Sequence, residues 1–66
     1  MSFEKLVIEL VTKTFSSVKA DFYYGTLFAR CNAAEAAKLE TQFLDNFGFP
    51  VIVSKVGNDF AFDFVW

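Results

Sequence analysis

The sequence predicts an α+β fold in which two helices pack on one face of a three-stranded sheet. Three observations predict this class. The stretch from Asn32 to Gly48 carries helix signals at both ends, the stretch from Pro50 to Trp66 has the pattern of a β-hairpin, and the elements follow the order helix, strand, helix, strand, strand. Residues 1–66 are expected to form one small domain, because so short a chain has only a single core to offer.

The first element is predicted to be a helix over Phe3–Ser17, with Ser2 as its N-cap. Lys5, Glu9 and Lys13 recur every four residues and form one charged stripe on that helix. Apolar side chains occupy the remaining arc, which is wide enough to make contacts on two sides. The β-branched residues in this stretch leave a strand as the alternative interpretation.

The second element is predicted to be a single strand over Asp21–Cys31 that is apolar on both sides. In a strand, alternate side chains share one side. One side would carry Phe22, Tyr24 and Phe28, and the other would carry Tyr23, Leu27, Ala29 and Cys31.

The third element is predicted to be a helix, because the sequence carries signals for its start and for its end. Asn32 and Glu35 have the spacing of a capping box at its start, and Gly48 occupies the position of a left-handed C-cap at its end. Between them lies a stretch rich in helix formers. Glu40 falls on the apolar arc of this helix, where it could lie at the rim or pair with a buried donor such as Tyr23 or Tyr24.

The last two elements are predicted to form a hairpin with a two-residue Gly57-Asn58 loop. If Val56 and Asp59 close the loop, the register is fixed, and Val53 lies opposite Phe62. One side of the hairpin is then almost wholly apolar and faces the helices, with Phe60, Phe62 and Phe64 opposite Lys55, Val53 and Val51. The other side is mixed, with Ile52, Ser54 and Val56 opposite Asp63, Ala61 and Asp59.

The strand order follows from the connections. The helix between the first two strands forms a β-α-β unit with parallel strands. The third strand, which is rich in Phe, then fits between them, so that the spatial order is first, third, second. The alternative places the Pro50–Val56 strand in the centre.

Two segments resemble the RNA-recognition motif family, namely "LFARCN" over Leu27–Asn32 and "NDFAFDF" over Asn58–Phe64. The resemblance implies that Phe28 and the hairpin phenylalanines would stack on bases. That arrangement would turn Asp59 and Asp63 toward the helices, and burying two unpaired carboxylates is too costly for a small core. We therefore expect the hairpin phenylalanines to point inward and no RNA-binding platform to form.

Composition argues against several other functions. The chain has no histidine, so the commonest general base and metal ligand is missing, and we expect no enzymatic activity, no cofactor and no metal. The net charge of −2 opposes nucleic-acid binding.

The single cysteine, Cys31, rules out an internal disulfide and suits a reducing cytoplasmic compartment, although a helix N-terminus beside Cys31 could lower its pKa. We expect neither a signal peptide nor a membrane span, because charged residues interrupt the N-terminal stretch and every apolar run falls short of the ~20 residues that a span needs.

What remains is the face of the sheet that the helices leave uncovered. Hydrophobic residues make up 55% of the chain, and a small protein rarely exposes a large apolar patch. We therefore expect a second copy to cover that face and the chain to act as a homo-oligomeric interaction or regulatory module, with another protein as a further partner. The alternative is a binder of a small apolar ligand, held at the sheet–helix core or at the dimer seam, with Glu40 and Tyr23 as possible contacts. An RNA binder is the less favoured alternative. The interface candidates are Phe22, Tyr24, Phe28, Arg30, Ile52, Ala61, Asp63, Val65 and the terminal Trp66. Arg30 and Asp63 could form a charged pair, within one copy or across the seam, that sets the register.

Overall fold

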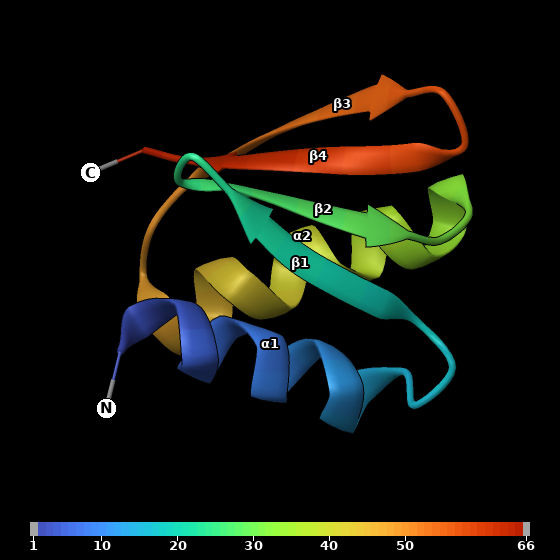
Figure 1. Ribbon diagram of the computed structural model, residues 1–66. Helices are drawn as coiled ribbons and strands as arrows, with labels where there is room; N and C mark the ends of the chain where they lie inside the picture. The colour runs from blue at the N-terminus through green and yellow to red at the C-terminus, as the bar shows by residue number, and fades with distance from the viewer. Residues whose placement is uncertain (1, 66) are drawn as a thin grey trace.

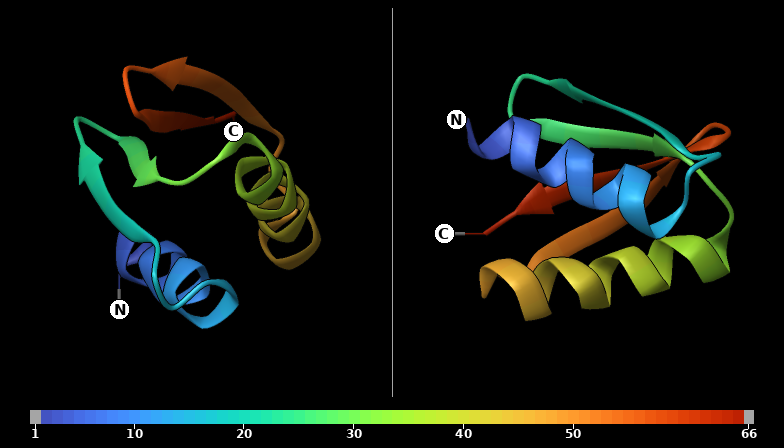
Figure 2. Two further views of the ribbon diagram at one scale, coloured as in Figure 1. Left: turned by 90° about the vertical axis from the view of Figure 1, so that its right-hand side faces the viewer. Right: turned by 90° about the horizontal axis from the view of Figure 1, so that it is seen from below.

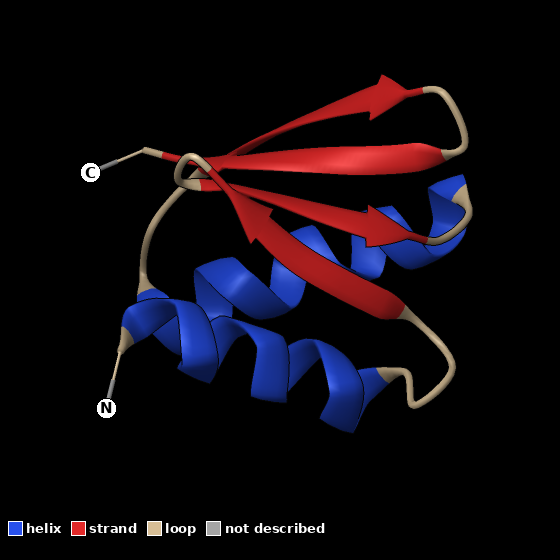
Figure 3. Ribbon diagram, viewed as in Figure 1, coloured by secondary structure: helices blue, strands red, loops and turns tan. Residues whose placement is uncertain are grey.

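Two helices and four strands follow one another along residues 2–65, the part of the chain that the computed structural model describes (Figures 1 and 3). Their bounds are α1 Phe3–Thr14, β1 Lys19–Tyr23, β2 Thr26–Arg30, α2 Ala33–Phe47, β3 Val51–Val56 and β4 Asp59–Phe64. The strands form an antiparallel sheet in the order β1-β2-β4-β3. Both helices lie on one face of this sheet, as the views from the side and from below show (Figure 2). The other face, called here the outer face, carries no helix.

The α+β class is confirmed, whereas the predicted three-stranded sheet and its order are wrong. The stretch that was predicted as one strand folds back on itself at Tyr24-Gly25 and forms the β1-β2 hairpin. Both turn residues have positive φ, 50° for Tyr24 and 81° for Gly25. A tight turn of this kind normally carries Asn or Asp before glycine, because an ordinary side chain is strained in the left-handed region. A tyrosine at this position therefore concealed the turn.

Helix α1 is confirmed as a helix, and Ser2 caps it by accepting a hydrogen bond from the backbone N–H of Lys5 at 3.2 Å. Val7 and Val11, one turn apart, are fully buried, so this face packs on the core. The helix ends at Thr14 rather than Ser17, because Phe15 has extended backbone angles.

Helix α2 has the predicted limits. The Asn32 side chain accepts from the backbone N–H of Glu35 at 2.8 Å, and the Glu35 carboxylate accepts from the backbone N–H of Asn32 at 3.0 Å, which completes the capping box. Gly48 ends the helix in the left-handed conformation, with φ 74°. Ala36, Leu39 and Phe43 are the buried residues of this helix, and they hold it against the sheet.

The β3-β4 hairpin has the predicted register, with Val56 opposite Asp59 and Val53 opposite Phe62. Strand β4 lies between β2 and β3, so its apolar side covers the middle of the core. Phe62 is fully buried there, and its ring meets the edge of the Phe43 ring at a centroid distance of 5.5 Å. The inward direction of Phe62 is what the charge argument predicted.

Much of the aromatic content is explained by one cluster between the sheet and the helices. Ring contacts at centroid distances of 5.2–6.5 Å join Phe3, Phe22, Phe43, Phe47, Phe62 and Phe64. Many of these are edge-to-face contacts, which add to the free energy of simple burial. Bulky rings therefore give this short chain a dense core. Neither of the two described helices is long and apolar enough to cross a membrane.

Candidate interaction site on the outer face of the sheet

The outer face is a regular grid, because each of the four strands turns three side chains away from the helices. Cross-strand pairing arranges these side chains in three rows. The first row is Lys19, Arg30, Asp59 and Val56; the middle row is Asp21, Phe28, Ala61 and Ser54; the last row is Tyr23, Thr26, Asp63 and Ile52. The columns of this grid are β1, β2, β4 and β3 in that order.

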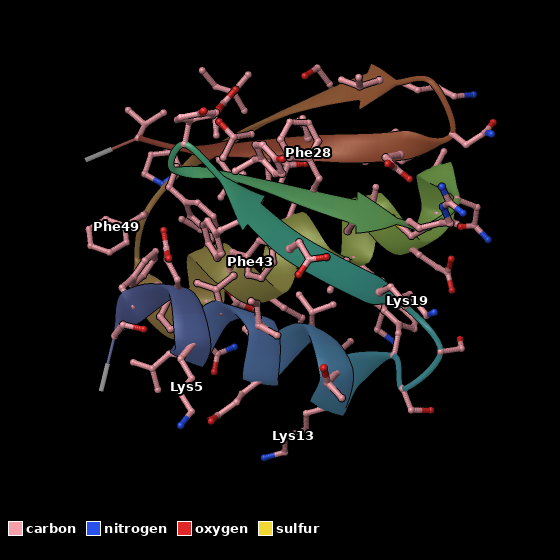
Figure 4. The ribbon with its side chains drawn as sticks, viewed as in Figure 1. Lys5, Lys13, Lys19, Phe28, Phe43 and Phe49 are labelled. Carbon is pink, nitrogen blue, oxygen red and sulfur yellow. The ribbon has the colours of Figure 1, made fainter. Side chains whose placement is uncertain are left out.

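A hollow of about 520 Å³ lies on this face beside Phe28. All four residues of the first row line it, together with Asp21, Tyr23 and Phe28. Figure 4 shows Phe28 on the side of the sheet away from the helices, whereas Phe43 lies between the sheet and the helices. Ala61, opposite Phe28 on the neighbouring strand, is only 4% exposed although it belongs to the outer face. The centre of the outer face is therefore apolar and partly covered.

Charged and hydroxyl groups surround this apolar centre. The guanidinium Nε of Arg30 donates to Asp59 Oδ1 at 3.2 Å, and the two side chains are 74% and 36% exposed. An ion pair this exposed contributes at most about 1 kcal/mol to stability. The hydroxyl of Thr26 donates to Asp63 Oδ1 at 2.6 Å. The predicted Arg30–Asp63 pair does not form within one copy, because Arg30 and Asp63 lie at opposite ends of adjacent strands.

The structure brings part of the predicted interface set together. Phe28, Arg30, Ile52, Ala61 and Asp63 all lie on the outer face.

Three other candidates lie elsewhere. Phe22 was expected beside Phe28 but faces the helices, because the Tyr24-Gly25 turn pairs it with Leu27 on the core side, and its ring stacks on Phe64 at 6.2 Å. Tyr24 is 98% exposed at the turn itself. Val65 follows β4, where its N–H donates to the carbonyl of Pro50, and Trp66 lies outside the described residues.

The predicted contact between Glu40 and Tyr23 is not formed. Glu40 is exposed on α2, whereas Tyr23 projects from β1 on the outer face, so the helix layer and the sheet separate the two side chains. The prediction also missed three members of the outer face, namely Lys19, Asp21 and Thr26. It placed Ser54, Val56 and Asp59 on this side of the hairpin but did not include them among the interface candidates. The one signal that could have identified the β1 and β2 members is Gly25, which marks the hidden turn.

Cys31 lies between β2 and α2 and is half-buried. Burial raises the pKa of its thiol, and the nearby carboxylates of Glu35 and Asp59 raise it further. The expected lowering by the helix N-terminus is therefore wrong, because desolvation and these two negative charges both disfavour the thiolate.

Among residues 2–65, the cysteine and carboxylate side chains form no group of three that could hold a metal ion. The fold and the outer face together define a two-layer α+β protein with an open, mixed-character sheet surface. No family model matches the chain, and comparison with curated proteins and with solved structures finds no similar protein.

Proposed function

We propose that this chain is a non-catalytic interaction module that acts as a homo-oligomer, most simply a dimer, through the outer face of its sheet. The observation that carries the proposal is the set of exposed apolar side chains on that face. Tyr23, Ile52 and Val56 are 65%, 60% and 50% exposed at three corners of the grid, and Tyr23 and Val56 line the hollow together with the half-buried Phe28. Exposed apolar surface that gathers around a hollow is typical of an interaction site. The dimer would in turn bind a larger protein as a regulator, adaptor or inhibitor.

The size of the face sets the expected strength of the pairing. Strands about 4.8 Å apart and residues about 3.3 Å apart give a face of about 20 Å by 20 Å. That is a projected area of about 400 Å², about half of the ~800 Å² of accessible surface that a specific complex of standard size buries on each partner, so the pairing should be weak. A dissociation constant of about 1–100 µM follows, so the monomer should be present at low concentration.

The β3 edge of the sheet is less suitable for pairing than the outer face. Strand β3 is an edge strand, and a second copy could in principle extend the sheet there. Pro50 directly precedes that strand, however, and Lys55 places a charge on its helix-facing side opposite Phe60. Proline and inward-pointing charges are devices that protect edge strands from pairing. These features favour association through the outer face.

Sedimentation equilibrium at about 5–500 µM tests the proposal. We expect dimers at the upper concentrations and a melting temperature that rises with concentration, because folding and association are then coupled. Ile52→Lys should abolish the dimer while leaving the circular dichroism spectrum unchanged, since Ile52 is 60% exposed. Leu44→Lys is the matched control, because Leu44 is 51% exposed on α2 and should tolerate the change without effect on association.

Phe28→Asp should also give a monomer, or a poorly folded chain because Phe28 is half-buried, which is why Ile52→Lys decides the matter. A monomer at every concentration would refute the proposal. Equal disruption by Leu44→Lys would assign the contact to the helices instead.

A second candidate function rests on the hollow itself. Its volume of about 520 Å³ lies within the ~300–1,000 Å³ of typical ligand pockets. Lys19, Asp21, Arg30 and Asp59 contribute charges to its lining, so it suits a small polar or zwitterionic aromatic molecule better than a purely apolar one. Ligand-observed NMR with a fragment library would test this, and competition between a bound fragment and dimer formation would place the fragment at the seam.

A further inference from the structure

We infer that the two copies pack sheet against sheet with their strands aligned, about a two-fold axis that runs along the strands between β2 and β4. The inference rests on the proposed function and specifies its geometry. It comes from the positions of the charges on the outer face, which are complementary to a second copy in this arrangement and repulsive in the alternative.

Two aligned arrangements are available when one sheet packs face to face on its own copy. An axis along the strands keeps each row opposite itself and exchanges the columns, so that β2 lies over the partner's β4 and β1 over the partner's β3. An axis across the strands keeps each column opposite itself and exchanges the first and last rows. The cross-strand register of the outer face then decides which side chains meet in each case.

The three aspartates of the outer face distinguish the two arrangements. With the axis along the strands, Asp59 lies opposite Arg30 of the second copy, Asp63 opposite Thr26, and Asp21 opposite Ser54. Every carboxylate then faces a cation or a hydroxyl donor, and each contact occurs twice in the dimer. Arg30–Asp59 and Thr26–Asp63 are pairs that already form within one copy, so the interface repeats chemistry the chain supports.

With the axis across the strands, the same three aspartates meet only one another. Asp21 lies opposite its own copy, and Asp59 lies opposite Asp63 in both directions. Like charges that lose water at an interface repel one another strongly. This arrangement is therefore disfavoured by the outer face itself.

The apolar side chains agree with the axis along the strands. Tyr23 of one copy lies opposite Ile52 of the other, which covers two of the most exposed apolar side chains on this face. The half-buried Phe28 lies near the axis, where it meets the centre of the second copy. Aligned sheets cross at about 30°. This crossing shifts the edge strands β1 and β3 by about 4 Å along their length relative to the strands they face, which is about half the distance between neighbouring rows. The contacts between β2 and β4, nearest the axis, are changed least.

Tyr23 and Ile52 also supply an unambiguous measurement. They belong to β1 and β3, the two edge strands, which are separated by β2 and β4. At about 4.8 Å per strand they lie about 14 Å apart within one copy, which is too far for a nuclear Overhauser effect between them. Any such signal between the Tyr23 ring and the Ile52 methyl groups must come from two copies.

The experiment is an isotope-filtered NOESY spectrum on an equal mixture of labelled and unlabelled chain, at a concentration where sedimentation shows the dimer. We expect intermolecular signals from Tyr23 to Ile52. Signals from Ile52 to Val56 of the other copy would overturn the inference, because those residues meet only with the axis across the strands. A dimer with signals from the helices alone would overturn it as well. A monomer at every concentration would refute the proposed function itself, so the two failures are distinguishable.

The salt dependence of dimer formation supplies an independent test, because added salt should weaken one arrangement and strengthen the other. Because the inferred seam brings opposite charges together, raising the NaCl concentration from 0.05 M to 0.5 M should weaken the dimer about fivefold, the effect of two exposed pairs. Arg30→Gln should weaken the dimer at low salt and remove most of this dependence, whereas Lys13→Gln on α1, whose side chain points away from the sheet, should not (Figure 4). A dimer that tightens with salt would contradict the inference, since it would show that like charges face one another.

Discussion

Phe62→Ala tests whether the hairpin phenylalanines hold the core. Phe62 is fully buried, and its ring contacts the edge of the Phe43 ring at 5.5 Å. Removing a buried phenylalanine ring destabilises a protein by about 3–5 kcal/mol through lost burial and the cavity left behind. The Phe43 contact argues for the upper half of that range. A chain of 66 residues has a free energy of unfolding of only about 3–10 kcal/mol, so the variant should be largely unfolded.

Urea unfolding followed by circular dichroism measures this loss. At about 1 kcal/mol per M, the low value expected for a small chain, the midpoint should fall by ~3 M or more. Phe62→Leu keeps most of the volume and should lose less than about 1.5 kcal/mol, which keeps the transition measurable. Leu44→Ala is the control, because Leu44 is 51% exposed and its loss should change the midpoint little. A Phe62→Ala variant with a near-normal midpoint, or one no worse than Leu44→Ala, would refute the packing described for this core.

Other expected outcomes follow from single features. Tyr24→Asn should stabilise the protein by about 1 kcal/mol in the same unfolding assay, because Tyr24 is strained at φ 50° and 98% exposed; a loss of stability would contradict this. Asn32→Ala should cost about 1 kcal/mol through the lost cap, and an unchanged midpoint would show that the capping box contributes nothing. Cys31 should react with iodoacetamide more slowly in the folded chain than in urea, because its raised pKa lowers the thiolate fraction, and stability should fall as pH rises above the ordinary thiol value of 9.0. Glu35→Gln, which can still cap the helix, should speed that reaction. The chain should bind neither single-stranded RNA nor DNA at physiological salt, because its net charge is −2 and its outer face has more acidic than basic side chains; micromolar, salt-sensitive binding measured by fluorescence anisotropy would contradict this.

The sequence by itself determined the elements whose signals are local. The capping box of Asn32 and Glu35 marks the start of α2, the left-handed Gly48 marks its end, and each signal acts within one turn of the helix. Gly57-Asn58 sets the register of the last hairpin, because a two-residue loop allows only one pairing of its flanking strands. That register and the cost of burying Asp59 and Asp63 together were enough to turn Phe62 toward the helices.

The tertiary structure decided what depends on residues far apart in the chain. The β1-β2 turn has Gly25 as its one local signal, because Tyr24 adopts a positive φ that its side chain disfavours and that only the completed sheet holds in place. The hydrogen bond between Thr26 and Asp63 joins positions that are 37 residues apart, and it exists only because β4 inserts beside β2. The charge pattern of the outer face has the same origin. Each row of the outer face contains residues from all four strands. Hydrogen bonds between the strands set which of these side chains become neighbours, and no local propensity predicts them.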